Sequence, residues 1–201
     1  MSKIVVIGAT GTIGQAAAAA LRDRHEVIEV GSTRGSLRVD SNDITSVRGL
    51  FEQIGKVDGV VATTGRVHFG ALQDTSAEQF GLGLRDKLMG QVNVVLAGLV
   101  WMNDGGSFTL TSGISAHEPV REGTNASCVN LALEGFVMGA SVDLPRGIRI
   151  NLVSPTILEE SVPVFGSYFC GFEPVSSKSV GLAYLRSIEG PETGRVYKVG
   201  Y

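Results

Sequence analysis

The sequence predicts an α/β fold in which a doubly wound parallel sheet carries helices on both faces, in three layers and one domain spanning residues 1–201. Two observations support this fold class. Short apolar runs alternate with helix-forming segments along the chain, which is the rhythm of parallel βαβ units. The chain has 201 residues, 43% hydrophobic and 18% charged, which suffices for one substantial core, and no linker-like stretch divides it.

The first half of the chain contains four short apolar runs that we expect to form strands. They span residues 3–7, 26–30, 37–40 and 58–62. An alanine-rich helix over residues 15–22 joins the first two strands, since alanine has the highest helix propensity. A second helix reaching Ile54 is predicted to begin at Asp43 or Thr45, because either side chain can cap the first turn.

A long helix dominates the second half, from Thr75 or Ser76 to about Met102. It contains glycines that each lower helix propensity by about 1 kcal/mol relative to alanine, so we expect them to permit close packing against a neighbouring helix. The remaining strands are predicted at residues 106–111, 148–153 and 194–199, and the remaining helices at 124–144 and 177–188.

The run Gly8-Ala9-Thr10-Gly11-Thr12-Ile13-Gly14 connects the first predicted strand to the first helix. In this strand–turn–helix context the glycine spacing is that of a Rossmann dinucleotide-binding turn. Gly8 can adopt backbone angles closed to other residues, Gly11 lets the backbone approach a pyrophosphate, and Gly14 lets the helix pack on the strand. Free N–H groups at the helix N-terminus would then bind the phosphates. The alternative is a tight turn that binds nothing.

The residues after the second predicted strand indicate which dinucleotide is bound. An acidic residue there binds the ribose hydroxyls of NAD, whereas an arginine accommodates the 2′-phosphate of NADP. The strand ends in Gly31-Ser32-Thr33-Arg34, and Glu29 lies two residues inside it. Ser32 can donate a hydroxyl hydrogen bond and Arg34 a charged one, so the sequence favours NADP. The alternative is that Arg34 is a solvated loop arginine.

Charge and composition argue against several other partners. Lys and Arg total 17 against 20 Asp and Glu, a formal charge of -3 without a basic cluster, so we expect no nucleic-acid and no membrane partner. Cys128 and Cys170 have neither disulfide nor metal-site spacing, so both are expected to be reduced and buried, and no metal site is predicted. A strand at the start of the chain leaves no room for a signal peptide, and the apolar runs are too short for a bilayer, so a cytoplasmic location is predicted.

The sequence resembles the short-chain dehydrogenase/reductase family over essentially its whole length. The matching segments follow the family's order: Gly8–Gly14, Asp40, Ala62–Gly65, Gly106–Gly113, Leu133–Phe136 and Arg146–Pro155. The resemblance implies an oxidoreductase whose nicotinamide cofactor is lined by Gly8, Thr10, Gly11, Thr12, Ile13, Gly14, Asp40, Thr63, Thr64, Gly65, Asn130, Pro155 and Ile157.

Chemistry in this family rests on an Asn, a Ser and a Tyr-x-x-x-Lys pair, and the resemblance places other residues at all four positions. Ala126 stands at the tyrosine and Asn130 at the lysine. The serine position falls on Gly113, with Ser112 one residue earlier, and the asparagine position holds Lys87. Alanine cannot transfer a proton, so another group must do so if this reaction occurs.

The main catalytic candidates are Lys87, Ser112 and His117. Lys87, His117 or Glu118 could replace the tyrosine as proton donor. His117 and Glu118 lie in the loop after the fifth strand, where substrate would lie. His68, after the fourth strand, is also on the ligand-bearing side. The alternatives are a helix-surface charge for Lys87 and an ordinary loop histidine for His117.

Three functions are compatible with these residues. The first is an NADP-dependent oxidoreductase that acts on a small-molecule carbonyl or alcohol substrate with a non-standard proton donor. The second is a catalytically inactive NADP-binding module that signals redox state or cofactor occupancy. The third is a scaffold that needs no cofactor, which the glycine turn and Arg34 disfavour. The sequence does not separate the first two.

The long predicted helix is apolar on more than one side. Its main stripe consists of Leu84, Leu88, Val92, Val95 and Leu99. Further apolar side chains extend around it at Leu82, Met89, Val94, Leu96, Val100 and Trp101. A helix that is apolar all round is usually buried on more than one side, and the family resemblance implies pairing through this helix and the next. We therefore expect a homodimer or homotetramer with a two-fold interface.

Overall fold

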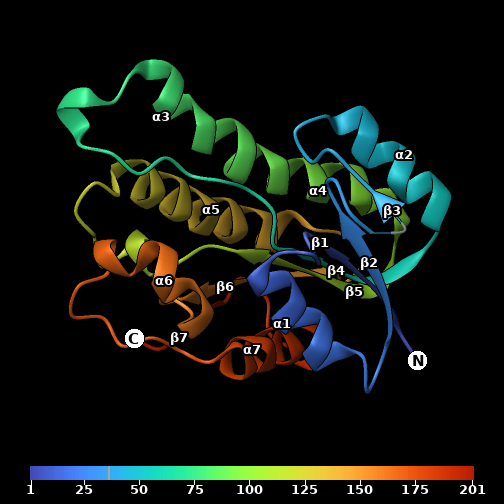
Figure 1. The fold of residues 1–201 in the computed structure, drawn as a ribbon. Helices are drawn as coiled ribbons and strands as arrows, with labels where there is room; N and C mark the ends of the chain where they lie inside the picture. The colour runs from blue at the N-terminus through green and yellow to red at the C-terminus, as the bar shows by residue number, and fades with distance from the viewer. Residues whose placement is uncertain (36) are drawn as a thin grey trace.

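Seven strands, all parallel, form one sheet in the order β3-β2-β1-β4-β5-β6-β7 (Figure 1). The computed structural model describes residues 1–35 and 37–201. The strands are β1 Lys3–Ile7, β2 Glu26–Gly31, β3 Leu37–Arg38, β4 Val57–Ala62, β5 Met102–Thr111, β6 Arg149–Pro155 and β7 Val196–Val199. The predicted doubly wound fold is confirmed. The strand order reverses between β1 and β4, and in such sheets ligands bind in the crevice at this point, outside the carboxyl ends of the strands.

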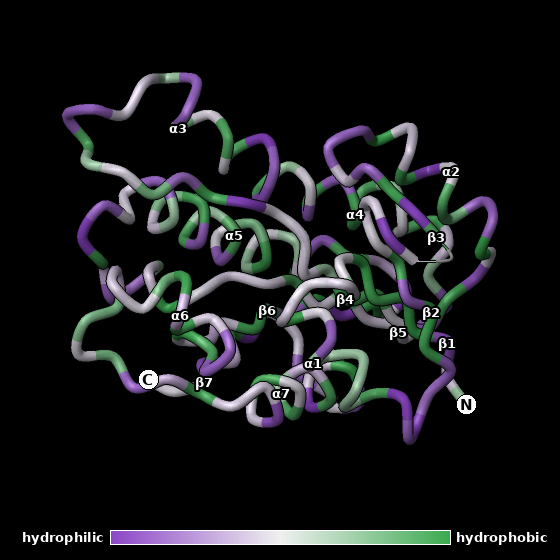
Figure 2. Tube along the Cα trace, in the orientation of Figure 1, coloured by the Kyte–Doolittle hydropathy of each residue, from purple (hydrophilic) through white to green (hydrophobic). Residues whose placement is uncertain are grey.

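Helices cover both faces of the sheet, because successive strand residues point to opposite sides. The longer helices are α1 Thr12–Leu21, α2 Ile44–Ile54, α4 Gly90–Gly98, α5 Thr124–Asp143 and α7 Ser177–Glu189. α1 and α7 pack on the face that bears Ile4 and Val6, whereas α2, α4 and α5 pack on the face that bears Val5 and Ile7. Apolar residues are concentrated in the strands between these two helical layers (Figure 2). The three predicted layers are therefore confirmed.

Shorter helical segments join these elements. They are α3 Ala77–Gly83, α6 Val162–Phe165 and the single turns η1 Leu72–Asp74, η3 Leu99–Trp101, η4 Ile114–Ala116, η5 Glu159–Ser161 and η6 Gly166–Tyr168. The run from η5 through α6 to η6 was not predicted, since segments of three or four residues are too short to show a helical period.

The long helix predicted from Ser76 is interrupted in its middle. It begins as predicted, because Ser76 and Gln79 cap each other's backbone N–H groups in a capping box. Between α3 and α4, however, Leu84–Met89 forms a π-helical segment, η2. Such segments are rare and are frequent at functional sites. The helical run ends at Trp101, close to the predicted end.

Two glycines of this helical run confirm the expected close packing. A Cβ at Gly83 would lie 2.2 Å from Oδ1 of Asn125 in α5. A Cβ at Gly98 would lie 2.8 Å from the ring of Phe51 in α2. Both neighbouring helices therefore approach more closely than any side chain at these positions would allow.

The structure corrects the expectation for the cysteines. Cys128 on α5 and Cys170 after η6 are both exposed, so the prediction that they are buried is wrong. Their small apolar side chains are accommodated at the surface, and neither contributes to the core. In the part of the chain that the structure describes, no helix has both the length and the apolar character needed to cross a bilayer.

Candidate functional site

The glycine turn between β1 and α1 has the geometry of a phosphate-binding turn. Gly8 has a φ of +88°, which residues with a side chain rarely adopt. A Cβ at Gly14 would lie 2.1 Å from the carbonyl oxygen of Gly8, so only glycine lets α1 begin this close to the strand. Within the described residues, the backbone N–H groups of Thr12, Ile13 and Gly14 donate no hydrogen bond. These donors at a helix N-terminus fit the pyrophosphate of a dinucleotide.

A groove beside this turn contains Arg34, the residue expected to select the cofactor. Its lining consists of Ala9, Thr10, Gln15, Ala19, Arg22, Glu29 and Arg34. Glu29 is paired with Arg22 at 2.5 Å, so the charges of these two side chains compensate each other. Arg34 is exposed and forms no ion pair with any residue that the structure describes. The groove therefore offers a cationic side chain to an anionic ligand.

The other predicted cofactor residues lie along the same edge of the sheet. Ser32 in the loop after β2 and Asp40 in the turn before α2 are both exposed. Thr63 Oγ1 donates a hydrogen bond to the carbonyl oxygen of Ile7 at 3.1 Å. This bond connects the residue after β4 to the end of β1. Thr64 follows and is half-buried. The turn, the groove and these residues together form one continuous candidate site for a dinucleotide.

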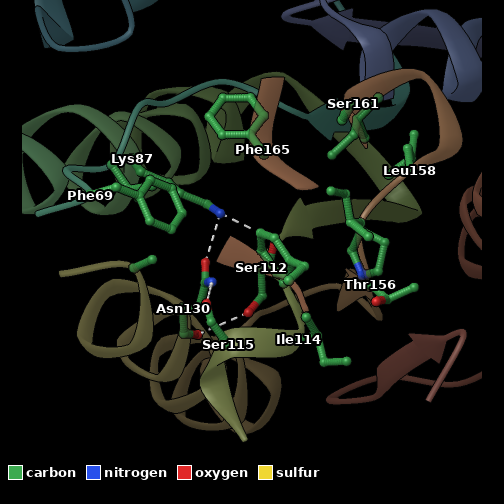
Figure 3. Close-up of a pocket in the computed structure, with 17 residues that line it drawn as sticks. Phe69, Lys87, Ser112, Ile114, Ser115, Asn130, Thr156, Leu158, Ser161 and Phe165 are labelled. Atoms are coloured by element: carbon green, nitrogen blue, oxygen red, sulfur yellow. Dashed lines mark hydrogen bonds between the residues drawn. The ribbon is translucent and has the colours of Figure 1, made fainter. Parts of the chain in front are cut away.

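A pocket with a volume of about 220 Å³ opens at the carboxyl ends of β5 and β6 (Figure 3). Among its lining residues are six that the sequence predicted: Ile13, Lys87, Ser112, Asn130, Pro155 and Ile157. Gly113 and Ala126, which the family resemblance places at the serine and tyrosine positions, also line it. None of the described residues that line this pocket carries a carboxylate.

Lys87 enters the pocket from the π-helical segment η2. Its Nζ donates to Asn130 Oδ1 at 2.7 Å and to the carbonyl oxygen of Ser112 at 3.1 Å (Figure 3). Gly65 permits this approach, since a Cβ there would lie 2.3 Å from the Cα of Lys87. Burial lowers the pKa of Lys87 to about 8, so the amine can gain or lose a proton near neutral pH.

Lys87 and Asn130 are hydrogen-bonded to each other in the pocket. By the family resemblance, position 87 would hold the asparagine and position 130 the lysine, so the resemblance implies that the two residue types are exchanged in this chain. The amine of the pocket projects from η2, whereas the resemblance would place it on α5. Gly113 gives the amide room, since a Cβ there would lie 3.2 Å from Asn130 Nδ2.

The structure places the other two catalytic candidates differently. Ser112 is buried, and its hydroxyl donates to the backbone carbonyl of Asn130 at 3.1 Å. His117 Nε2 lies 2.7 Å from Oε2 of Glu134 in α5. Neither His117 nor His68 lies among the residues that line the pocket. The geometry therefore favours Lys87 over both histidines as the group that exchanges a proton with a ligand.

Sequence reasoning missed one hydroxyl and an aromatic wall. Ser115 in η4 accepts a hydrogen bond from Asn130 Nδ2 at 2.8 Å. Phe69 stacks on Tyr168 with ring centroids 4.6 Å apart, and its centroid lies 6.0 Å from that of Phe165. The density of aromatic residues between positions 165 and 172, soon after a strand that ends at the ligand edge, is the signal that could have found this wall.

Comparisons with known proteins agree with this fold. A family profile described as enoyl-(acyl carrier protein) reductase matches residues 8–185. The crystal structure of the protein lin1944 from Listeria innocua is similar with a TM-score of 0.97 and 42% identity, covering 99% of this chain and 100% of that chain. A small-chain dehydrogenase solved in complex with NADPH gives a TM-score of 0.88 and 26% identity, with 98% and 96% covered. An uncharacterized oxidoreductase of Mycobacterium tuberculosis is 26% identical over 192 residues, which cover 79% of this chain and 68% of that protein.

Proposed function

This chain belongs to the short-chain dehydrogenase/reductase family, and we propose that it is an NADP-dependent oxidoreductase that interconverts a small carbonyl compound and its alcohol, with Lys87 as the proton donor. One observation carries the proposal. The Lys87 amine lies in a pocket that Ile13 of the glycine turn also lines, and Asn130 holds the amine there. A cofactor site and a titratable group thus adjoin each other, as hydride chemistry at a carbonyl requires.

The chain's own residues would hold the dinucleotide through the turn and the groove. The N–H groups of Thr12, Ile13 and Gly14 would bind the pyrophosphate. Arg34 and Ser32 would bind the 2′-phosphate that distinguishes NADP from NAD. The similarity to a dehydrogenase that was solved with NADPH supports the same choice. When bound, the cofactor supplies or accepts the hydride.

Lys87 would carry the proton that accompanies the hydride. In the reducing direction its ammonium gives a proton to the substrate oxygen, and in the oxidising direction the neutral amine takes a proton from the alcohol. A pKa of about 8 suits both directions, since each form is present near neutral pH. The Lys87 amine donates hydrogen bonds to Asn130 Oδ1 and to the carbonyl oxygen of Ser112. These two bonds fix the position of the nitrogen in the pocket.

The test is NADPH oxidation with a panel of small aldehydes and ketones. We expect Lys87→Met to lower kcat/KM by about 10²–10⁴-fold, the usual effect of losing a general acid, while NADPH affinity changes by less than about threefold. Lys56→Met is the matched control, because Lys56 is exposed and its Nζ donates to the carbonyl oxygen of Val100 outside the pocket. Full activity of Lys87→Met would refute this role.

A catalytically inactive NADP-binding module is the second candidate function. The observation in its favour is Ala126, which lines the pocket where the family's tyrosine would stand and brings no hydroxyl. Tight NADPH binding with no turnover of any compound in the panel would support this second function. Turnover that depends on Lys87 would exclude it.

We also propose that the protein assembles as a homodimer or homotetramer. The outer surface of η2, α4, η3 and α5 exposes large apolar side chains, namely Met89, Leu96, Val100, Leu131, Met138 and Val142. Exposed apolar side chains in this number on neighbouring helices are usually covered by another subunit. Leu96→Glu should therefore yield monomers in sedimentation at micromolar concentration, whereas the equally apolar but distant exposed site Leu72→Glu should not. A monomeric wild-type protein would refute the proposal.

A further inference from the structure

The Lys87 amine has an unshared lone pair whenever it is neutral. A neutral primary amine carries two N–H groups and one lone pair. Two acceptors lie within hydrogen-bond distance of Nζ, namely Asn130 Oδ1 at 2.7 Å and the carbonyl oxygen of Ser112 at 3.1 Å. They accept both N–H groups, and within residues 1–35 and 37–201 no group donates a hydrogen bond to this nitrogen. The lone pair is therefore available to attack an electrophilic carbon.

The surroundings of Lys87 favour the neutral amine over the ammonium. The lysine forms no ion pair with a described residue, and no described carboxylate lines the pocket. Burial lowers the pKa of Lys87 to about 8, so about a tenth of the amine is neutral at pH 7, against less than about a thousandth for an ordinary lysine. A lysine desolvated in an apolar pocket is an activated nucleophile toward carbonyl carbon.

The rest of the lining indicates which carbonyl compound fits. Phe69, Phe165 and Phe169 give the pocket aromatic walls, which pack well against an apolar ring. Condensation of an amine with a carbonyl group releases water, so walls that exclude water favour the product. An aldehyde carbon has one substituent fewer than a ketone carbon and is easier to approach for a nitrogen that two hydrogen bonds already hold. An uncharged aromatic aldehyde meets these conditions.

We propose that Lys87 forms a reversible imine with an aromatic aldehyde in this pocket. The Nζ lone pair attacks the carbonyl carbon, the C–N bond forms, and the electrons of the C=O π bond move to the oxygen, which gains a proton while the nitrogen loses one. The resulting carbinolamine loses its hydroxyl group and the remaining N–H proton as water, and the C=N bond forms without oxidation or reduction. A protonated imine keeps one N–H, for which Asn130 Oδ1 or the Ser112 carbonyl oxygen is the acceptor.

This activity goes beyond the proposed function. In carbonyl reduction the Lys87 ammonium gives a proton to the substrate oxygen, whereas here the neutral amine bonds to the carbonyl carbon. No dinucleotide takes part in the condensation. The two activities can therefore be measured separately.

The experiment incubates the full chain with benzaldehyde and sodium cyanoborohydride, without NADPH, at about pH 7. The borohydride reduces an imine much faster than the free aldehyde, so each imine becomes a stable N-benzyl lysine, and peptide mass mapping gives the labelling rate of each lysine. We expect Lys87 to be labelled at least about tenfold faster than Lys56 and Lys178, because its amine is desolvated in the pocket. These two control lysines are exposed and lie outside the pocket lining.

Asn130→Asp tests whether the pocket activates the amine. The substitution puts a carboxylate beside Nζ in place of the amide oxygen at 2.7 Å, and an ion pair keeps the amine protonated. Labelling of Lys87 should therefore slow by about tenfold or more, while Lys56 and Lys178 keep their wild-type rates. In the wild-type chain unfolded in urea, the preference for Lys87 should disappear, because the pocket is gone.

Selective labelling of Lys87 that is lost in Asn130→Asp and on unfolding supports the inference. Labelling of Lys87 no faster than that of Lys56, or undiminished selectivity in Asn130→Asp or in urea, would overturn it. Failure of the proposed function has a different signature, since NADPH is then not oxidised by any compound although Lys87 is still labelled selectively. NADPH oxidation that depends on Lys87, without selective labelling, would overturn the imine alone.

Discussion

The glycine turn after β1 and the Lys87 pocket lie along one edge of the same sheet, yet they present different kinds of chemical group. At the turn, the donors are backbone N–H groups, set in place by the φ of +88° at Gly8 and by the missing side chain at Gly14. In the pocket, the polar groups belong to the side chains of Lys87, Asn130 and Ser115. The turn depends on the shape of the backbone, and the pocket depends on residue identity.

This difference explains why the glycine turn can keep the family's spacing while the Lys87 pocket, by the family resemblance, does not. Backbone N–H groups are the same in every residue, so substitution in the turn can remove the site but cannot give it new chemistry. A side-chain site can be rearranged, provided that charge and hydrogen bonds remain satisfied. The exchange of lysine and asparagine that the family resemblance implies at positions 87 and 130 would be such a rearrangement, since the two side chains bind each other.

The largest effect should come from a side chain placed in the turn. Gly14→Ala puts a Cβ 2.1 Å from the carbonyl oxygen of Gly8, so α1 must move away from the strand. We expect NADPH affinity to fall by about 100-fold or more and the free energy of unfolding to fall by about 1–3 kcal/mol. Gly49→Ala in α2 is the control, because a Cβ there meets nothing within 4 Å and should stabilise the helix by about 0.5–1 kcal/mol. Calorimetric titration and thermal unfolding measure both; unchanged NADPH affinity in Gly14→Ala would contradict the backbone account.

The pH profile should separate the pocket from the turn. Because burial lowers the pKa of Lys87 to about 8, the amine is protonated below that pH and loses its proton above it. Carbonyl reduction needs the proton, so its kcat/KM should stay level at lower pH and fall about tenfold per unit above pH 8. Alcohol oxidation should rise with pH and level off above the same value. NADPH binding should show no transition at pH 8. A fall in reduction only near pH 10, the range of an ordinary lysine, would contradict the assignment.

Most of the fold could be predicted because burial and helix propensity leave periodic signals in the sequence. The predicted start of a helix at Asp43 is confirmed, because the Asp43 carboxylate accepts a hydrogen bond from the Thr45 N–H at 2.8 Å. The apolar face of this helix packs into the core. The π-helical segment Leu84–Met89 could not be predicted, since a single change of helical pitch depends on what packs beside it. Here the neighbour is Gly65, distant in sequence from most of the helix.

The candidate site was predictable where it depends on local sequence and not where it depends on tertiary contacts. The glycine turn is contiguous, so its residues were found together. The contact between Lys87 and Asn130 joins two helices that only the folded chain brings together, and the sequence alone showed each as an isolated departure from the family's pattern. Ser115 was missed for the same reason, because its hydrogen bond with Asn130 also forms only in the folded chain. His117 was named as a candidate from its loop position, but its partner Glu134 lies in α5.

A smaller effect is expected at the cofactor groove. Arg34→Asp removes a charge-assisted hydrogen bond of about 1.5–3 kcal/mol. NADPH affinity should therefore fall by about 10-fold to 150-fold, while NADH affinity stays level or rises. Arg48→Asp on the exposed side of α2 makes the same charge change outside the groove and should alter neither affinity by more than about twofold. Equal affinity of the unmutated protein for NADPH and NADH would contradict the assignment of Arg34 to the 2′-phosphate.

The smallest effect on activity is expected at His117. Its Nε2 bonds to Glu134 outside the pocket lining, so His117→Ala should leave kcat/KM within about twofold of the wild type. Stability should respond instead, because the Glu134 side chain is only 10% exposed, His117 is the partner of its Oε2 atom, and its Oε1 atom has no hydrogen-bond partner among the described residues. Losing a hydrogen bond to a charged group of this kind costs about 1.5–3 kcal/mol in unfolding free energy. His117→Gln, which keeps a donor, should recover much of that loss. If His117→Ala instead abolished turnover while Lys87→Met did not, the proton donor would lie in the loop after β5, and the side-chain pocket around Lys87 would lose its proposed role.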